Sequence, residues 1–337
     1  MGTKKIIYSC IILLVLLLVT SCQNETNLSE NASQETKKIT FILDWLPNTN
    51  HTGIYTAIEK GYFEDENLEV DVIQPSEGDA NVLVANGKGD FGISFQETVT
   101  MARTSDNPVP IVAIAAVLQH NTSGFASLSE NNILSPKDFE NHIYGSWGTD
   151  IETAFINTLM TKDNGDINKL DIVDITSYDF LTSITNDVDL QWIYYGWDGI
   201  AAQENGIDLN FIKLQDIDPD LDFYTPVIIT SEKMINEDPE LVSSFLRAVA
   251  KGYEYAANNP EDAVNDLLKH APELDKNLAI PSQKYLSKEY ISDADNWGIM
   301  KESVWTTFSQ WMYNNNVISK ELDVKQAFTN EFLPNNE

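Results

Sequence analysis

Residues 39–55 read ITFILDWLPNTNHTGIY, an apolar run followed by a polar loop and a second apolar pattern. The run 39–43 has the length and β-branched content of a buried strand. The helical pattern that follows opens near residue 53. This order predicts the start of a βαβ unit, with the loop 44–52 at the carboxyl end of its first strand. Ligands of open α/β sheets bind at such strand ends.

The same alternation continues along the chain. Strands are predicted at 69–73, 90–94 and 110–118, with helical patterns between them. A second series of strands is predicted at 124–128, 143–146, 170–175, 190–195 and 209–214. Helices are expected to begin near Ser135, Trp147, Tyr178 and Gly199. We therefore expect two tandem α/β units, each a parallel sheet covered by helices.

The part of the chain after the apolar run 226–229 is predicted to be helical. Helices are expected at 239–258, 260–270, 281–288 and 301–314, and three of these ranges begin with a proline. We expect them to pack back on the first unit, so that the chain crosses twice between two lobes with a ligand cleft between them. The predicted lobes are 38–120 with 222–337, and 121–221.

The first 37 residues are predicted to be a secretion signal followed by a flexible tether. Lys4 and Lys5 precede an apolar run at 6–19, as in a secretory leader covering residues 1–21. The run is shorter than the roughly 20 residues that span a bilayer. Thr20 and Ser21 precede Cys22, which resembles a bacterial lipobox, so we expect lipid attachment there and a mature protein anchored on the extracytoplasmic face of the cell membrane. Residues 22–37 are polar and predict a flexible tether.

Composition excludes several classes of function. A formal net charge of −31 argues against a nucleic-acid binder, because phosphate repels such a surface. The two cysteines, Cys10 and Cys22, fall in the leader and the lipobox, which excludes disulfides and thiolate metal sites in the folded part. His120, His142 and His270 are isolated in the sequence, so we expect no metal and no cofactor.

The loop after the first strand carries the motif that identifies a family, Asp44-Trp45-x-Pro47-Asn48-x-Asn50-His51-x-Gly53. With residues 60–63 and 87–93, it resembles the ThiY-like lipoproteins that feed thiamine-pyrimidine precursors to ABC transporters, within the SsuA/THI5-like (NMT1) superfamily. The resemblance implies a type II periplasmic-binding fold and permease and ATPase partners. It also implies a small-molecule aminopyrimidine ligand, formylaminopyrimidine or hydroxymethylpyrimidine. Riboflavin or another aromatic heterocycle is the alternative, because relatives with a similar loop bind flavin.

The candidate ligand-binding residues supply flat faces and polar edges. Aromatic faces can come from Trp45, Tyr55, Trp147, Trp192, Tyr194, Tyr195, Trp197 and Tyr224, and polar groups from Asp44, Asn48, Asn50, His51, Ser94, Glu97 and Asp198. A flat aminopyrimidine needs aromatic stacking and acceptors for its exocyclic amine. No lysine or arginine lies in these segments, so a neutral or cationic ligand fits better than an anion.

Each of these residues also has a structural interpretation. Buried aromatics more often fill cores than bind ligands, and His51 and Asp44 could cap or pack at a helix start. Asp198 lies in the motif YYGWDG at 194–199. Relatives often carry a glutamate that contacts ligand in this motif, and the aspartate side chain is one methylene shorter.

An enzyme with the same fold is the main rival. The chain also resembles fungal pyrimidine-phosphate synthases, in which a lysine and a histidine follow the strand equivalent to 90–93 and a cysteine-rich segment binds iron. This chain has Ser94 and Thr98 in place of the lysine and the histidine, and Leu-Asp-Phe-Tyr at 221–224 in place of the cysteines. We therefore expect a binding protein without catalytic residues. A surface adhesin is a third class, which the absence of repeats disfavours.

Overall fold

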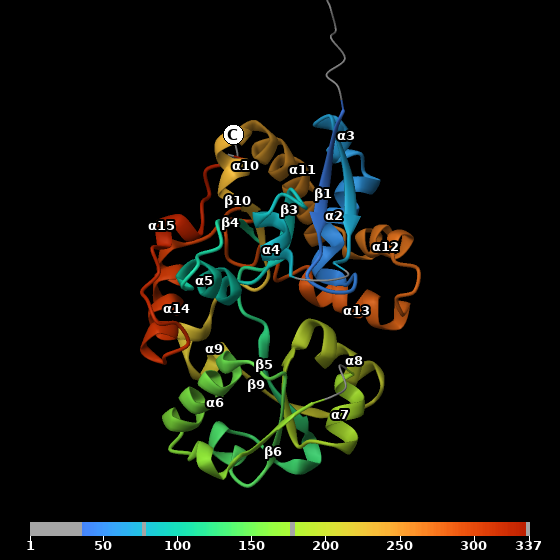
Figure 1. Ribbon diagram of the computed structural model, residues 1–337. Helices are drawn as coiled ribbons and strands as arrows, with labels where there is room; N and C mark the ends of the chain where they lie inside the picture. Colours follow the sequence, from blue (N-terminus) through green and yellow to red (C-terminus); the bar gives the residue numbers. More distant parts are fainter. Residues whose placement is uncertain (1–35, 76–78, 176–178, 335–337) are drawn as a thin grey trace, which may run out of the picture. The chain divides into compact units, whose positions relative to one another are not determined.

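The computed structural model describes residues 36–75, 79–175 and 179–334 (Figure 1). The described residues from Lys37 onward form one compact unit. The predicted leader, Cys22, most of the tether and Tyr178 lie outside the described residues. Within the described ranges, no helix has the length and apolarity that crossing a bilayer requires.

The first of two five-stranded sheets has the order β2-β1-β3-β10-β4. Its strands are β1 (Lys37–Ile42), β2 (Leu68–Ile73), β3 (Phe91–Ser94), β4 (Ile111–Ala116) and β10 (Val227–Ser231). β1 pairs in parallel with β2 and β3, whereas β10 runs antiparallel to β3 and β4. The predicted parallel sheet is therefore mixed, because β10 enters it from the opposite direction.

The second sheet repeats this pattern with the order β7-β6-β8-β5-β9. Its strands are β5 (Ser123–Leu128), β6 (Ile143–Ser146), β7 (Asp171–Asp174), β8 (Leu190–Tyr194) and β9 (Leu209–Lys213). β6 is parallel to β7 and β8, and β5 is antiparallel to β8 and β9. It too is mixed where a parallel sheet was predicted. Every predicted strand is present, with its ends displaced by no more than two residues.

Helices α2 (Thr52–Glu59), α11 (Pro239–Asn258) and α12 (Pro260–His270) pack together beside the first sheet. Phe245 of α11 stacks on Phe91 of β3 with ring centroids 3.8 Å apart. Helices α2 and α11 cross closely at two glycines, because a β-carbon at Gly252 would collide with the carbonyl oxygen of Gly53. Gly53 and Gly252 therefore serve close helix packing.

The remaining C-terminal helices contact both cores. In α14 (Glu302–Asn314), Trp305 packs with residues of the first sheet, while Phe308 and Trp311 join the core of the second. Helix α13 (Lys276–Leu286) contacts α8 (Ile200–Glu204) and the π-helical turn η5 (Tyr195–Gly199). The predicted start of α13 at Pro281 is wrong. The Asp275 side chain caps the helix, which begins at Lys276, so Pro281 lies inside it.

The other elements are short, apart from the helices α5 and α6. They are η1 (Thr49–His51), α3 (Tyr62–Asp65), α4 (Ala80–Ala85), α5 (Gln96–Thr104), η2 (Ser129–Asn131), η3 (Pro136–Phe139), α6 (Asp150–Lys162), η4 (Ile167–Lys169), α7 (Phe180–Asn186), α9 (Leu214–Ile217), η6 (Pro219–Leu221), α10 (Glu232–Glu237) and α15 (Val324–Ala327).

The chain passes between the sheets twice, from β4 to β5 and from β9 to β10. The two connections are hydrogen-bonded to each other. The Asn121 backbone N–H donates to the Asp222 carboxylate at 2.9 Å, and its side-chain amide donates to the Leu221 carbonyl at 2.9 Å. His120 contacts Asp222 at 2.7 Å and Asp293 at 3.1 Å. We refer to residues 117–122 and 221–226 as the paired connections.

Candidate functional site

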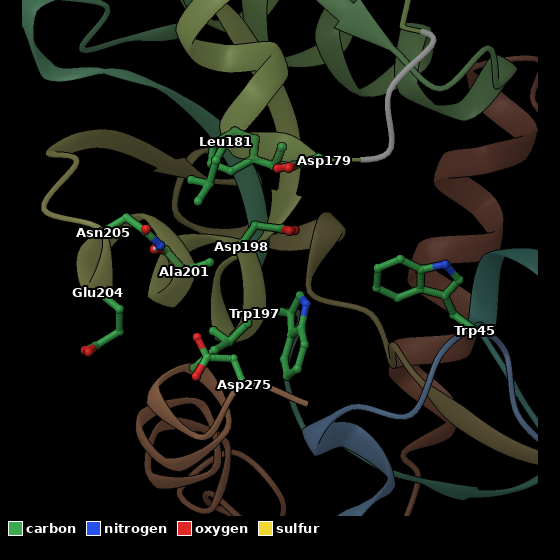
Figure 2. Close-up of a pocket in the computed structure, with 11 residues that line it drawn as sticks. Trp45, Asp179, Leu181, Trp197, Asp198, Ala201, Glu204, Asn205 and Asp275 are labelled. Atoms are coloured by element: carbon green, nitrogen blue, oxygen red, sulfur yellow. Dashed lines mark hydrogen bonds between the residues drawn. The ribbon is translucent and has the colours of Figure 1, made fainter. Parts of the chain in front are cut away.

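A pocket of about 360 Å³ collects side chains from three parts of the chain. Figure 2 shows them coming from the loop after β1, from the α7 and η5–α8 region, and from the residue before α13. The lining residues are Trp45, Asp179, Phe180, Leu181, Trp197, Asp198, Ala201, Glu204, Asn205, Asp275 and Leu278. Two indoles and four acids thus share one cavity, whose lining includes no lysine or arginine.

The loop after β1 is fixed by hydrogen bonds among its own side chains. The buried His51 accepts the Asn48 backbone N–H at Nδ1, at 3.2 Å, so its Nε2–H donates to the Asp44 carboxylate at 2.7 Å. The Asn48 side chain caps η1 by accepting the Asn50 backbone N–H at 2.9 Å. These bonds hold Asp44 at the end of β1 and leave Trp45 44% exposed beside the pocket.

The turn η5 brings Trp197 and Asp198 to the pocket, and one serine ties it to other elements. The Ser282 hydroxyl of α13 donates to the Gly196 carbonyl, and the Thr49 hydroxyl lies 2.6 Å from Ser282 Oγ. A β-carbon at Gly196 would lie 2.7 Å from the Leu286 side chain. Glycine therefore lets η5 approach α13 without displacing the Leu286 side chain.

Two acids near this region are poorly solvated, because Asp198 is half-buried in the pocket wall and Glu97 is buried. Burial raises the pKa of Asp198 to about 7, and Asp198 Oδ2 accepts only a long bond, 3.4 Å, from the Tyr194 backbone N–H. Glu97, in the first turn of α5, is 5% exposed, and burial raises its pKa to about 8. The pKa of Tyr194 is raised well above its usual range by burial, then by the charges of Glu97, Asp44 and Asp198. The Tyr194 phenol therefore lies close enough to these three acids for their charges to raise its pKa.

Further aromatic residues lie along β8 and at the start of the segment before α6. Tyr194 packs against Trp192 with ring centroids 5.6 Å apart. Trp147 is 40% exposed, and its indole N–H points to the Trp192 carbonyl at 3.4 Å. Trp147, Trp192 and Tyr194 do not line the cavity described above.

Several candidate residues make other contacts and also do not line the pocket. Tyr55 is buried and stacks on His270 at 5.0 Å, and Tyr195 packs on Phe211 and Tyr285. The Tyr224 phenol accepts the Lys301 backbone N–H at 2.8 Å, the Ser94 hydroxyl donates to Asn81, and the Asn50 carbonyl accepts the Tyr253 hydroxyl. Ligand contact by these residues stays a prediction.

The pocket also contains residues that sequence reasoning did not single out. Asp179 and Phe180 begin α7, Glu204 ends α8, and Asp275 caps α13. Asp179 and Asp275 carry the ordinary sequence signal of a helix cap, which does not distinguish a pocket residue. Asp275 reaches the site through the packing of α13 against η5, and Asp179 through the packing of α7 against β8, neither of which a local pattern encodes.

The geometry favours binding a flat, hydrogen-bonding ligand. Indole faces stack on aromatic rings, and carboxylates accept hydrogen bonds from N–H donors. A cavity walled by acids repels an anion. Within the described ranges, no group of three or more histidine, cysteine, aspartate or glutamate residues could hold a metal ion.

Comparisons with known proteins agree with this chemistry. A family model described as NMT1/THI5 like matches residues 48–263. The chain is 27% identical to the formylaminopyrimidine-binding protein of Halalkalibacterium halodurans, covering 94% of this chain and 96% of the relative. It is 26% identical to a 4-amino-5-hydroxymethyl-2-methylpyrimidine phosphate synthase of Candida albicans, over 88% of each chain.

Two further likenesses extend the range of relatives. The riboflavin-binding protein RibY of Chloroflexus aurantiacus is 24% identical over 96% of each chain. The periplasmic aliphatic sulphonate-binding protein SsuA of Escherichia coli superposes with a TM-score of 0.67 at 11% identity, covering 89% of this chain and 94% of that one. The fold is thus that of periplasmic binding proteins, as the sequence predicted.

Proposed function

Since the chain belongs to the NMT1/THI5 like family, we propose that it is the solute-binding component of an ABC importer and captures a thiamine-pyrimidine precursor. The ligand we propose is formylaminopyrimidine or hydroxymethylpyrimidine. The observation that carries this proposal is the pocket itself, in which Trp45 and Trp197 accompany four acids without a cation. The similarity to a formylaminopyrimidine-binding protein over nearly the whole chain supports it.

In this proposal the indoles stack on the pyrimidine ring and the acids accept hydrogen bonds from its amino groups. Trp45 lies in the loop after β1 and Asp198 in η5, which follows β8, so one ligand in the pocket would contact groups that follow strands of both sheets. The two lobes, which we propose are 38–120 with 222–337 and 121–221, then close on it through the paired connections. The closed state presents the loaded protein to the permease and ATPase subunits.

Binding without catalysis is the second part of the proposal. The synthases resembled by this chain need a lysine and a histidine after the strand equivalent to β3. Here Ser94 ends β3 and donates its hydroxyl to Asn81 at 2.7 Å, and Thr98 follows in α5. Neither side chain is a nitrogen nucleophile, which supports a binder over a synthase.

Riboflavin is the alternative ligand, since a riboflavin-binding relative matches 96% of the chain. The volume of about 360 Å³ lies near the lower end of the range for small-molecule pockets, roughly 300 to 1,000 Å³. A single pyrimidine ring fits that size better than a flavin tricycle with a ribityl chain.

A thermal-shift panel tests the proposed ligand class. A ligand that binds only the folded state raises the unfolding temperature with its concentration. We expect formylaminopyrimidine or hydroxymethylpyrimidine to raise it, and taurine, a zwitterionic sulfonate used as a control, to leave it unchanged. A shift with taurine or riboflavin alone would overturn the pyrimidine assignment.

The lipid anchor is a separate proposal that rests on the sequence alone. We propose that Cys22 is acylated and holds the protein on the extracytoplasmic face of the membrane. Metabolic labelling with a palmitate analogue should mark the wild-type protein and miss Cys22→Ser. Equal labelling of both proteins would contradict this.

A further inference from the structure

The two indoles that line the pocket stand on segments with different supports. Trp45 lies in the loop after β1, and Trp197 lies in η5, which follows β8. Figure 2 shows the two indoles reaching the pocket from these separate segments. The strands β1 and β8 belong to different sheets, so they do not pair with each other. The spacing between the indoles therefore depends on contacts made by the loop and by η5 rather than on strand pairing.

Two buried hydroxyls connect these segments. Thr49 in η1 and Ser282 in α13 are both fully buried, and their hydroxyl oxygens are 2.6 Å apart. The Ser282 hydroxyl donates to the Gly196 carbonyl, next to Trp197. Because a carbonyl can only accept, Ser282 uses its single proton there and accepts the hydrogen bond from Thr49. The hydrogen bonds thus run in one direction, from Thr49 through Ser282 to Gly196, and we call these three residues the hydroxyl tie.

The tie begins at a fixed point beside the first sheet. The Tyr290 hydroxyl donates to the Thr49 carbonyl at 2.6 Å, and Tyr290 is fully buried in the core that contains β1 and β3. Thr49 also follows Trp45 by only four residues, in the loop that Asn48 and His51 fix by their hydrogen bonds. The position of the Thr49 hydroxyl is therefore set by the same contacts that place Trp45.

The other end of the tie is η5, a single π-helical turn. Turns of this kind are rare and frequently lie at functional sites. The Asp198 side chain in the turn accepts only the 3.4 Å bond from the Tyr194 backbone. The bond from Ser282 to Gly196 is buried and comes from α13, which packs directly on the turn. Helix α13 therefore holds the carbonyl that precedes Trp197.

We propose that the hydroxyl tie sets the position of Trp197 relative to Trp45, which makes Thr49 and Ser282 positioning residues for ligand capture. Neither of them lines the pocket. This inference rests on the proposed pyrimidine-binding function and adds the residues that space its aromatic walls. A gap of about 0.5 to 1 Å removes a quarter to a half of a dispersion contact, so small shifts of an indole matter. Breaking the tie therefore weakens binding through Trp197.

Two substitutions break the tie at different points. Ser282→Ala removes the hydroxyl that joins the other two members, whereas Thr49→Val keeps the shape of threonine and the Ser282–Gly196 bond. In calorimetric titration of the leaderless protein with formylaminopyrimidine, Ser282→Ala should bind about tenfold more weakly and Thr49→Val about threefold. The control is Ser287→Ala, at the end of the same helix, where a buried hydroxyl donates to the Lys284 carbonyl at 3.1 Å. It should bind as wild type does.

A double-mutant cycle separates positioning from a general structural role. If the tie acts by holding Trp197, the two losses overlap, and Ser282→Ala with Trp197→Ala should bind within about threefold of Trp197→Ala alone. Single losses that multiply in the double variant would overturn the inference. If Ser282→Ala does not fold, the same cycle is made with Thr49→Val, which removes one hydroxyl at nearly constant volume.

Hydrogen exchange tests the tie without any ligand. The backbone amides of 197–200 should exchange about tenfold faster in Ser282→Ala than in wild type or Ser287→Ala, while those of α11 keep their wild-type rates. Unchanged exchange in η5, or equal affinity of wild type and Ser282→Ala, would overturn the inference and leave the proposed function standing. Failure of wild type to bind any pyrimidine would overturn the proposed function, and the exchange comparison would still decide whether the tie holds η5.

Discussion

The indoles of Trp45 and Trp197 are unusual because both line a cavity whose charged side chains are all acidic. The Trp45 side chain is exposed, whereas the Asp44 and His51 side chains of the same loop are hydrogen-bonded to each other. An aromatic side chain exposed in this way contributes most when a flat ligand covers it, since stacking adds to the removal of apolar surface from water. We therefore expect the binding free energy to be concentrated on these two residues.

Replacing Trp197 by alanine should weaken pyrimidine binding by about 1 to 2 kcal/mol, roughly 5- to 30-fold, through lost stacking. Titration of the variant measures this directly. Tyr313→Ala, which removes an exposed aromatic from α14, is the matched control and should bind as wild type does. Equal affinities for wild type and Trp197→Ala would place the ligand elsewhere.

At the scale of elements, the paired connections join the sheets through a histidine and two acids. His120 lies in the first connection, Asp222 in the second and Asp293 in the C-terminal segment. The pKa of His120 is raised, chiefly by its hydrogen bond to Asp222 and also by Asp293. The protonated imidazole is therefore the form that links the three segments.

The stability of wild type relative to His120→Gln should depend on pH. A group whose folded pKa is raised contributes stability that is fully present below its unfolded pKa, about 6.5, and is lost as pH rises through the higher folded pKa. The difference in unfolding free energy should thus be largest in acid and shrink toward alkaline pH, measured by urea denaturation at each pH. A difference that grew with pH would contradict the assignment.

The crossing of α2 and α11 is the tightest helix contact that we describe. In Gly252→Ala the new methyl group meets the Gly53 backbone, which cannot rotate away, so we expect a loss of about 1 to 3 kcal/mol despite the better helix propensity of alanine. Denaturant unfolding measures it. Lys251→Ala, at the exposed neighbouring position, should change stability by less than about 0.5 kcal/mol. Comparable losses in both variants would mean that the crossing is not the cause.

Local sequence patterns predicted much of the fold but little of the site. Alternating apolar runs predicted the strands well, because burial acts on each run separately. The direction of β10 depends on where the chain re-enters the first sheet. The start of α13 depends on the Asp275 cap, which lets the helix begin before the proline at 281. Trp45, Trp197 and Asp198 were predicted and line the pocket, whereas Asp179 and Asp275 reach it only through tertiary packing.

At the scale of the whole molecule, two mixed sheets and helices shared between their cores hold the acidic, indole-lined pocket. A formal net charge of −31 adds to the repulsion of anionic ligands by the pocket acids. A neutral or cationic heterocycle fits these charges as the ligand, and we propose that this heterocycle is a pyrimidine.

The most direct test is calorimetric titration of the leaderless protein with formylaminopyrimidine, followed by the same titration in the presence of riboflavin. We expect saturable one-to-one binding of the pyrimidine that riboflavin does not displace. Binding of riboflavin with no heat from the pyrimidine would contradict it, and would assign the pocket to the flavin.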